Sequence, residues 1–235
     1  MRRAVVVLSA SALVLGVSQI TSASAQEPPL CGPPGGEVPA TIVGAGKIKG
    51  TPGDDVIVGS AQADDIRGLG GDDIICAEGG NDDVSGGPGT DTLIGDGADL
   101  PPFIPSTGDN DDRLDGGPGD DTLAGLGGDD TMRGGPGDDQ LIGFGGDDDI
   151  DGAPGADTAF GGPGVDGISG GQGTDTLWGN FGSDVISGGQ GNDFIDGDNP
   201  FPPVEPLPFP PGGNDDLCTG GQGADAISNC ETTVQ

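Results

Sequence analysis

The chain of 235 residues carries seven lysine and arginine residues against 40 aspartate and glutamate residues, a formal net charge of −33. This charge excludes nucleic acid as a partner, because the phosphate backbone would meet a surface of its own sign. The absence of histidine and tyrosine excludes zinc-protease motifs, Ser-His-Asp triads and histidine acid-base chemistry. With 31% hydrophobic and 3% aromatic residues, the composition is typical of disorder, and only a regular spacing of the carboxylates argues for a fold.

The first 25 residues have the layout of a secretory signal peptide. Met-Arg-Arg is followed by an apolar run through Leu15 and by the small residues Ala23-Ser24-Ala25. The apolar run is too short to span a bilayer, and no later segment is longer, so we expect no membrane span. Cleavage after Ala25 would release a soluble, extracellular chain with five basic and 40 acidic residues, a formal charge of −35.

Residues 26–49 form a leader that ends in a capping half-repeat. Lys47-Ile48-Lys49 keeps the alternation of a short strand, but Gly46 stands where the following repeats carry aspartate. Terminal repeats of stacked structures are atypical in this way because they cover an exposed end. We therefore expect the leader to cap the first repeats.

Residues 50–228 repeat every nine residues with the pattern G-G-x-G-x-D-x-U-x, of which Gly116 to Ala124 and Gly170 to Trp178 are clean copies. The sixth-position residues are Asp55, Asp64, Asp73, Asp82, Asp91, Asp112, Asp121, Asp130, Asp139, Asp148, Asp157, Asp166, Asp175, Asp184, Asp193, Asp215 and Asp225. The apolar eighth-position residues are Ile57, Ile66, Ile75, Val84, Leu93, Leu114, Leu123, Met132, Leu141, Ile150, Ala159, Ile168, Leu177, Ile186, Ile195, Leu217 and Ile227. A register held over so many copies is not produced by chance.

The residue types indicate what each nonapeptide forms. Glycine allows turn conformations that a Cβ forbids, and the x-U-x tripeptide is a short strand with one inward side chain. Two nonapeptides make one coil, so stacked coils give two parallel sheets around a thin apolar core. The predicted fold is all-β, a right-handed parallel β-roll (β-solenoid).

The repeat resembles the calcium-binding nonapeptide of the RTX (hemolysin-type) family, whose signature it matches. The resemblance implies calcium ions between turns 18 residues apart, such as those of Asp121 and Asp139, held by sixth-position aspartates and backbone carbonyls. Hard oxygen ligands suit calcium better than zinc or copper. The candidate metal ligands are Asp55, Asp73, Asp82, Asp91, Asp121, Asp130, Asp139, Asp148, Asp157, Asp166, Asp175, Asp184, Asp193 and Asp225. The alternative, a merely solvated acidic turn, would leave stacked carboxylates repelling one another.

Three sixth-position aspartates are left out of this set. The turn before Asp64 lacks the fourth-position glycine, having Gln62 there and Ala63 after it. Proline-rich insertions at 97–109 and 199–212 interrupt the turns of Asp112 and Asp215. Residues 229–235 form a C-terminal tail after the last repeat.

Four cysteines in an exported chain predict disulfides, and three pairings are possible. We favour Cys218 with Cys230, which lie close together around the last repeat. Cys31 would then pair with Cys76, because the leader must fold back onto the first coils.

We expect no catalytic residues and no enzyme. The carboxylate pairs that a glycosidase needs are all copies of the same turn, and about 25 residues between signal peptide and repeats leave no room for a catalytic domain. The leading interpretation is a calcium-dependent structural or interaction module. The main rival is an adhesin or matrix protein that binds a specific partner, and an ice-binding roll is a more distant alternative because Gln140 interrupts its threonine ladder.

Alternate repeats predict one apolar and one polar outer face. The ninth-position residues of one set are Val58, Cys76, Ile94, Ala124, Ile142, Phe160 and Trp178, before Asp196. Those of the other set are Arg67, Ser85, Asp115, Arg133, Asp151, Ser169 and Ser187. Strand propensity alone favours apolar residues anywhere, so their confinement to one sheet would indicate a contact surface for a protein, a cell surface or a second copy.

Overall fold

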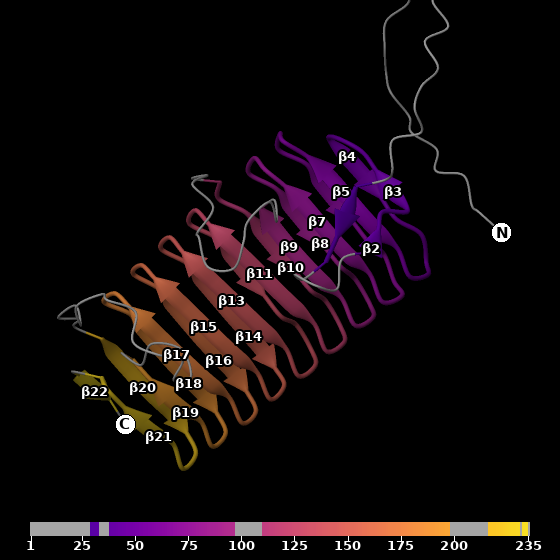
Figure 1. The fold of residues 1–235 in the computed structure, drawn as a ribbon. Coiled ribbons are helices and arrows are strands. Elements are labelled where there is room, and N and C mark those ends of the chain that lie inside the picture. Colours follow the sequence, from indigo (N-terminus) through magenta and orange to yellow (C-terminus); the bar gives the residue numbers. More distant parts are fainter. Residues whose placement is uncertain (1–28, 33–37, 97–109, 198–215, 231, 235) are drawn as a thin grey trace, which may run out of the picture.

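A computed structural model of the chain describes residues 29–32, 38–96, 110–197, 216–230 and 232–234. The described part is a rod of stacked coils that runs from β3 and β4 at one end to β21 and β22 at the other (Figure 1). The proposed signal peptide and both proline-rich insertions lie outside the described residues. No described segment is a helix long and apolar enough to cross a membrane.

Each coil contributes one strand to each of two parallel sheets, here called the odd sheet and the even sheet. The odd sheet contains β3 (Ile42–Val43), β5 (Val56–Ser60), β7 (Ile74–Glu78), β9 (Thr92–Asp96), β11 (Thr122–Gly127), β13 (Gln140–Gly145), β15 (Thr158–Pro163), β17 (Thr176–Phe181), β19 (Phe194–Asp196) and β21 (Ala226–Ser228). The even sheet contains β4 (Lys47–Lys49), β6 (Asp65–Arg67), β8 (Asp83–Ser85), β10 (Arg113–Asp115), β12 (Thr131–Arg133), β14 (Asp149–Pro154), β16 (Gly167–Gln172), β18 (Val185–Gln190), β20 (Leu217–Gln222) and β22 (Thr232–Val234).

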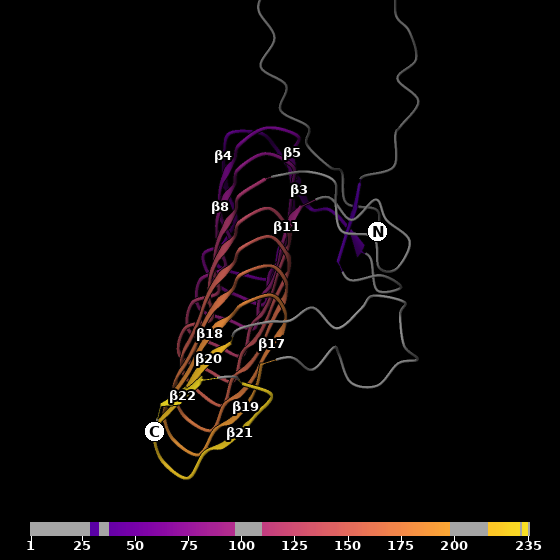
Figure 2. The same ribbon diagram turned by 90° about the vertical axis from the view of Figure 1, so that its left-hand side faces the viewer.

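Strands two apart in sequence pair in register, so that equivalent positions of successive coils lie side by side. Leu123 is paired with Leu141, and Leu141 with Ala159, along the odd sheet. Figure 2 shows the two sheets facing one another, with β4, β8 and β18 on one side and β5, β11 and β17 on the other. The predicted all-β parallel β-roll is confirmed.

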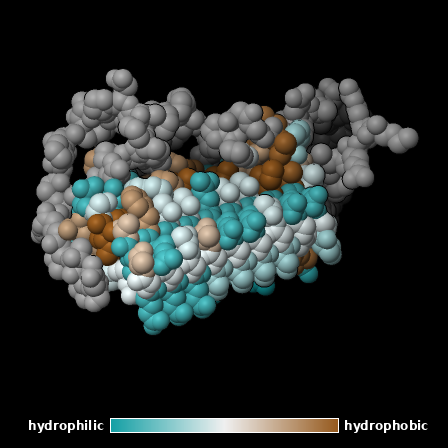
Figure 3. All heavy atoms as spheres, turned by 90° about the horizontal axis from the view of Figure 1, so that it is seen from below, coloured by the Kyte–Doolittle hydropathy of each residue, from teal (hydrophilic) through white to brown (hydrophobic). Residues whose placement is uncertain are grey.

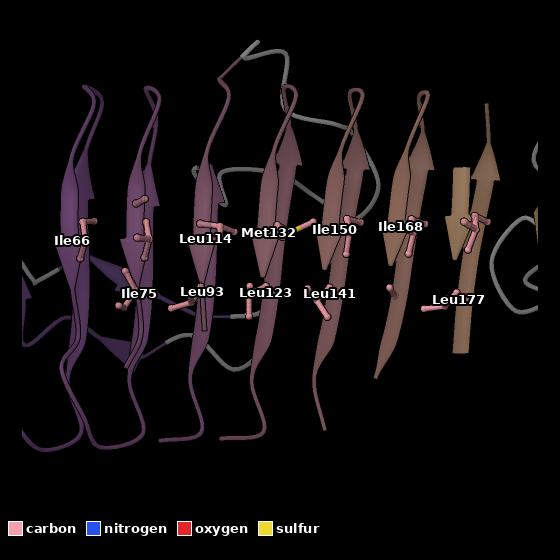
Figure 4. Close-up of a cluster of buried hydrophobic side chains, with 14 of the residues drawn as sticks. Ile66, Ile75, Leu93, Leu114, Leu123, Met132, Leu141, Ile150, Ile168 and Leu177 are labelled. Carbon is pink, nitrogen blue, oxygen red and sulfur yellow. The ribbon is translucent and has the colours of Figure 1, made fainter. Parts of the chain in front are cut away.

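The eighth-position side chains form the core between the two sheets. Figure 4 shows Leu93, Leu123 and Leu141 from one sheet beside Leu114 and Ile150 from the other. Most of these side chains are completely buried, and burying each one contributes about 1.5–3 kcal/mol. Because only one side chain per strand points inward, the core is a single layer of pairs that continues from coil to coil.

One predicted register is wrong by one residue after the second insertion. The core position is filled by Cys218, which has no exposed surface, whereas Leu217 is 37% exposed on the outside. Asp216 is fully buried in the turn, and Asp215 lies outside the described residues. The physical reason is the two-residue period of a strand, in which a slip of one residue moves every side chain to the other face.

The predicted disulfides are both confirmed. Cys31 is bonded to Cys76, with a Cα–Cα distance of 5.8 Å, and Cys218 to Cys230, with 6.0 Å. The first of these ties an antiparallel pair, β1 (Leu30–Cys31) and β2 (Val38–Pro39), to the outer face of the odd sheet. The leader therefore packs on the side of the first coils.

The two outer faces differ as the ninth positions predict. The apolar set lies on the odd sheet, where Ile142 is paired with Phe160 and Phe160 with Trp178. The polar set lies on the even sheet, where Arg133 is paired with Asp151. On the side of the roll seen in Figure 3, hydrophilic and neutral residues predominate, and hydrophobic residues gather along one margin and near the ends.

Candidate metal centre

The turns stack into two columns, one along each edge of the roll, and each turn ends in an aspartate, which is buried in every turn but the last. The odd column, which leads into the odd strands, contains Asp55, Asp73, Asp91, Asp121, Asp139, Asp157, Asp175, Asp193 and Asp225. The even column, which leads into the even strands, contains Asp64, Asp82, Asp112, Asp130, Asp148, Asp166, Asp184 and Asp216. The predicted site residues are thus divided between two rows rather than gathered at one place.

Glycine makes this stacking possible at the first and fourth positions of the turn. A methyl group on Gly116 would overlap Oδ2 of Asp121 and lie 2.8 Å from the carbonyl oxygen of Gly134 in the next coil. Gly119 has a φ of 145°, and a Cβ there would overlap the carbonyl oxygen of Gly89. The space beside the first glycine is therefore lined by a carboxylate oxygen and a backbone carbonyl.

One carboxylate oxygen of each aspartate holds the neighbouring coil. The main-chain N–H of Asp121 donates to Oδ1 of Asp139 over 2.8 Å, and that of Asp139 donates to Oδ1 of Asp157 over 2.9 Å. The same bond is present where the insertions interrupt the sequence, since the N–H of Asp82 donates to Oδ1 of Asp112 over 2.8 Å. The insertions therefore leave the columns continuous.

The other carboxylate oxygen, Oδ2, is buried and accepts no hydrogen bond at most positions. This holds for Asp73, Asp82, Asp91, Asp112, Asp121, Asp130, Asp139, Asp148, Asp157, Asp166, Asp175 and Asp193. A buried carboxylate oxygen without a donor is costly, and it becomes favourable only when a cation or a proton satisfies it. Carboxylate and carbonyl oxygens are the ligands that calcium prefers. The residues present therefore fit calcium ions between successive turns.

Backbone carbonyls of the same turns supply further oxygen atoms. The carbonyl of Gly116 accepts the N–H of Gly87 over 2.8 Å, and that of Pro118 accepts the N–H of Gly89 over 2.9 Å. A carbonyl oxygen has two lone pairs, so each retains one after this bond. Among the described residues, no three acidic or cysteine side chains converge on one point. The donor set is thus aspartate pairs with carbonyls, rather than a cage of side chains.

Burial changes the protonation of these aspartates in the absence of metal. Desolvation raises the pKa of Asp121 and of Asp139 to about 6, and that of Asp112 and Asp166 to about 8. The bond from the N–H of the preceding coil lowers each pKa, and neighbouring aspartates raise it, but burial is the largest effect. The metal-free turns therefore favour protonated carboxyls at slightly acidic pH, and at Asp112 and Asp166 the raised pKa extends this to neutral pH.

The first turn of each column is built differently. Oδ2 of Asp55 accepts the N–H of Thr51 over 2.6 Å, and Oδ2 of Asp64 accepts the N–H of Ser60 over 2.7 Å. In both turns the hydroxyl also bonds the backbone two residues ahead, with Thr51 Oγ1 3.1 Å from the carbonyl oxygen of Gly53. The Oδ2 atoms of both aspartates therefore accept a hydrogen bond within their own turns. In this respect the predicted ligand Asp55 differs from the later members of its column.

The remaining outliers lie at the insertions and at the C-terminal end. Asp112, which we left out of the predicted set, has the same buried Oδ2 as its neighbours. Asp225, which we included, is only half-buried, and its Oδ1 accepts the N–H of Asp193 over 3.1 Å. No further described turn stacks beyond Asp225.

Sequence reasoning missed a second row of side chains at the fifth position. Oδ1 of Asp120 accepts the N–H of Asp138 over 2.9 Å, and Oδ1 of Asp138 accepts the N–H of Ala156 over 2.9 Å. On the other edge, Oδ1 of Asp129 accepts the N–H of Asp147 over 2.9 Å. The recurrence of Asp-Asp pairs every 18 residues was the signal for it. This outer row is solvent-exposed and joins the coils, whereas the inner row has the geometry for metal.

Comparison with known proteins identifies the repeat. The family described as RTX calcium-binding nonapeptide repeat (4 copies) matches residues 49–84, 77–99, 106–141, 142–177 and 169–199. These segments together cover more than half of the chain and contain both columns except Asp216 and Asp225. No curated protein matches the chain.

Proposed function

Because the chain belongs to the RTX calcium-binding nonapeptide repeat family, we propose that it is a secreted, extracellular calcium-binding β-roll that acts as a structural or interaction module without catalysis. RTX repeats bind calcium, and the aligned buried aspartates fit multiple ions. The observation that carries the proposal is the row of buried Oδ2 atoms that accept no hydrogen bond.

The proposed ligands are the inner aspartates together with carbonyls of the stacked turns. They are Asp73, Asp82, Asp91, Asp112, Asp121, Asp130, Asp139, Asp148, Asp157, Asp166, Asp175, Asp184 and Asp193, with Asp225 at the C-terminal end of the odd column. When bound, calcium supplies positive charge between carboxylates that otherwise repel one another. Oδ1 fixes the position of the next coil through its backbone bond, and the first-position glycine keeps the space beside Oδ2 open.

Several observations support the absence of catalysis and the extracellular location. Every close pair of inner carboxylates repeats the same turn, so none has the asymmetric surroundings that separate an acid from a base. Two disulfides are typical of an oxidising compartment. We propose that residues 1–25 are the signal peptide that directs export, and that the charge excludes nucleic acid as a partner.

Calcium binding is tested by isothermal titration of the chelator-treated chain. The proposal expects several ions per chain, released by chelator and not replaced by magnesium at equal concentration, because magnesium demands a tighter octahedral site. Binding of one ion or none would contradict it. N-terminal sequencing of the protein recovered from the medium of expressing cells tests export, and the expected first residue is Gln26.

An adhesin or matrix protein that binds its partner through the apolar face of the odd sheet is the second candidate. The observation that favours it is the segregation of apolar ninth-position residues on that sheet, with Phe160 and Trp178 partly exposed. Capture of a partner from the cell surface that is lost on replacing Trp178 with serine, but not Ser187 on the opposite sheet with alanine, would establish this function.

A further inference from the structure

The apolar face of the odd sheet is already a docking surface along its first coils. Val58, Cys76 and Ile94 are nearly buried, because Cys31 and Ala40 of the leader pack on them. The prolines of the described part of this segment, Pro29 before β1 and Pro39 in β2, are exposed rather than packed on the face. The N–H of Ala40 donates to the carbonyl of Pro29 over 2.9 Å, which holds the leader together. Here a segment of the chain itself covers the face, through Cys31 and Ala40.

The same face continues beyond the leader as a stripe that we define as Ala124, Ile142, Phe160 and Trp178. These residues are partly exposed and lie on adjacent strands in register. The rings of Phe160 and Trp178 are stacked at 4.4 Å and nearly parallel, and Phe194 is tilted against Trp178 at 5.9 Å. Rings stacked from strand to strand present their edges outward, which does not suit a flat sugar ring.

Apolar residues also line one rim of the stripe in a strained conformation. Leu126 and Phe144 have φ values of 87° and 75° at the second position of their turns, and they are neighbours on β11 and β13. The equivalent residues of the opposite column are Gly117 and Gly135, which adopt positive φ without a steric penalty. Leu126 already packs against the leader cluster. The second turn position also has a positive φ at Glu78 and Asn180, so this conformation belongs to the turn rather than to the apolar side chains.

We propose that residues 199–212 of the same chain dock on this stripe. Their sequence is Asn-Pro-Phe-Pro-Pro-Val-Glu-Pro-Leu-Pro-Phe-Pro-Pro-Gly, with a single charged residue in a chain of net charge −33. The segment begins at Asn199, with two residues between it and the end of β19, and the last residue of that strand, Asp196, is the register partner of Trp178. Polyproline segments lose little entropy on binding and fit aromatic surfaces.

Residues 199–212 are long enough to cross the stripe and return to the roll. Polyproline advances about 3.1 Å per residue, so 14 residues extend roughly 43 Å. Two strand spacings of about 4.8 Å separate Trp178 from Ile142, which leaves enough chain to cross the stripe and return to Asp216. Because the segment is tethered at β19, its effective concentration at the stripe is high. A second copy of the chain, which is equally acidic, would have to compete with it for the stripe.

Trp178 is the only tryptophan of the chain and therefore reports on the stripe directly. The test compares the calcium-saturated chain with the variant F201S/L207S/F209S, by tryptophan emission and acrylamide quenching. The matched control, L100S/F103S/I104S, makes an equivalent change in the other insertion. Far-UV circular dichroism shows in parallel that each variant keeps its β structure, so a failure of calcium-induced folding is distinguished from a failure of docking.

The proposal predicts that the 199–212 variant shifts Trp178 emission to the red and raises the quenching constant about twofold, because the indole loses its apolar cover. The control leaves both unchanged. Replacing 199–212 with a glycine-serine linker of equal length gives the same result as the triple substitution. Unchanged quenching in both 199–212 variants would overturn the proposal. So would quenching of the parent that depends on protein concentration, which would assign the stripe to a second copy.

Discussion

The main-chain N–H of Asp91 donates to Oδ1 of Asp121 over 2.7 Å, although the two residues are separated by 30 positions in sequence. Where no insertion intervenes, the same bond joins residues 18 apart, as between Asp121 and Asp139. The hydrogen bond between successive turns is therefore kept across the 97–109 insertion. At most positions of the columns, one carboxylate oxygen of the inner aspartate accepts this bond and the other is buried without a hydrogen-bond donor.

Because the inner aspartate of a turn is buried and the outer one is exposed, we predict unequal effects on stability when each is replaced. Asp121→Asn removes the negative charge of a buried carboxylate that the metal needs, so we expect a loss of about 1.5–3 kcal/mol in the calcium-saturated chain. Asp120→Asn is the matched control, because an exposed amide oxygen still accepts the N–H of Asp138, and its effect should stay within about 0.5 kcal/mol. Urea unfolding in calcium measures both, and equal losses would refute the assignment of inner and outer rows.

The space beside the first-position glycine of the turn gives a second prediction. Gly116→Ala places a methyl group against Oδ2 of Asp121 and the carbonyl of Gly134, so calcium-induced folding should require a higher calcium concentration. Gly53→Ala is the control, because nothing lies within 4 Å of its Cβ position. Its effect on stability should be within about 0.5 kcal/mol. Calcium midpoints followed by circular dichroism compare the two, and identical midpoints would show that the space beside Gly116 is not needed.

The raised pKa values predict the pH dependence of the metal-free chain. Burial raises the pKa of Asp73 to about 6 and that of Asp112 and Asp166 to about 8, whereas unfolded aspartate titrates near 3.9. A group whose pKa is higher in the folded state stabilises the fold below its unfolded pKa, and this contribution is lost as pH rises through the folded value. In chelator, the chain should therefore be more stable at pH 5 than at pH 8.

Urea midpoints in chelator at the two pH values measure this difference. With saturating calcium the order should reverse, because protons and calcium compete for the same oxygen atoms. A metal-free chain that gains stability between pH 5 and pH 8 would contradict the raised pKa values.

The leader disulfide predicts a local rather than a global effect. Replacing Cys31 and Cys76 with alanine should cost about 2–4 kcal/mol and should increase hydrogen exchange first in β5 and β7, which the leader covers. Strands β15 and β17, far along the roll, should keep their protection, because each coil contacts mainly its neighbours. The control removes Cys218 and Cys230 and should affect the opposite end. Uniform loss of protection along the roll would count against this account.

Much of the architecture follows from the nine-residue period. The residues Leu123 and Asp121 recur with equivalents in every coil, so the core, the two sheets and both columns could be predicted from the sequence. The error at Asp215 arose because the second insertion interrupts the count. Asp216 and Cys218 lie nine residues before Asp225 and Ile227, and counting backwards from the last repeat recovers the register.

Other features depend on conformations that residue types do not specify. The hydroxyls of Thr51 and Ser60 close their turns locally and turn a backbone N–H towards the aspartate, which a consensus pattern cannot show. The positive φ of Leu126 and Phe144 is likewise imposed by the stacking of neighbouring coils, against the preference of the residues themselves.

The central claim is that calcium completes the fold by satisfying the buried Oδ2 atoms. It is tested most directly by far-UV circular dichroism of the chain in chelator at pH 8, followed by titration with calcium and, separately, with magnesium. The account predicts little strand signal in chelator, cooperative recovery with calcium and much weaker recovery with magnesium. Full β structure in chelator at pH 8, unchanged by calcium, would contradict it.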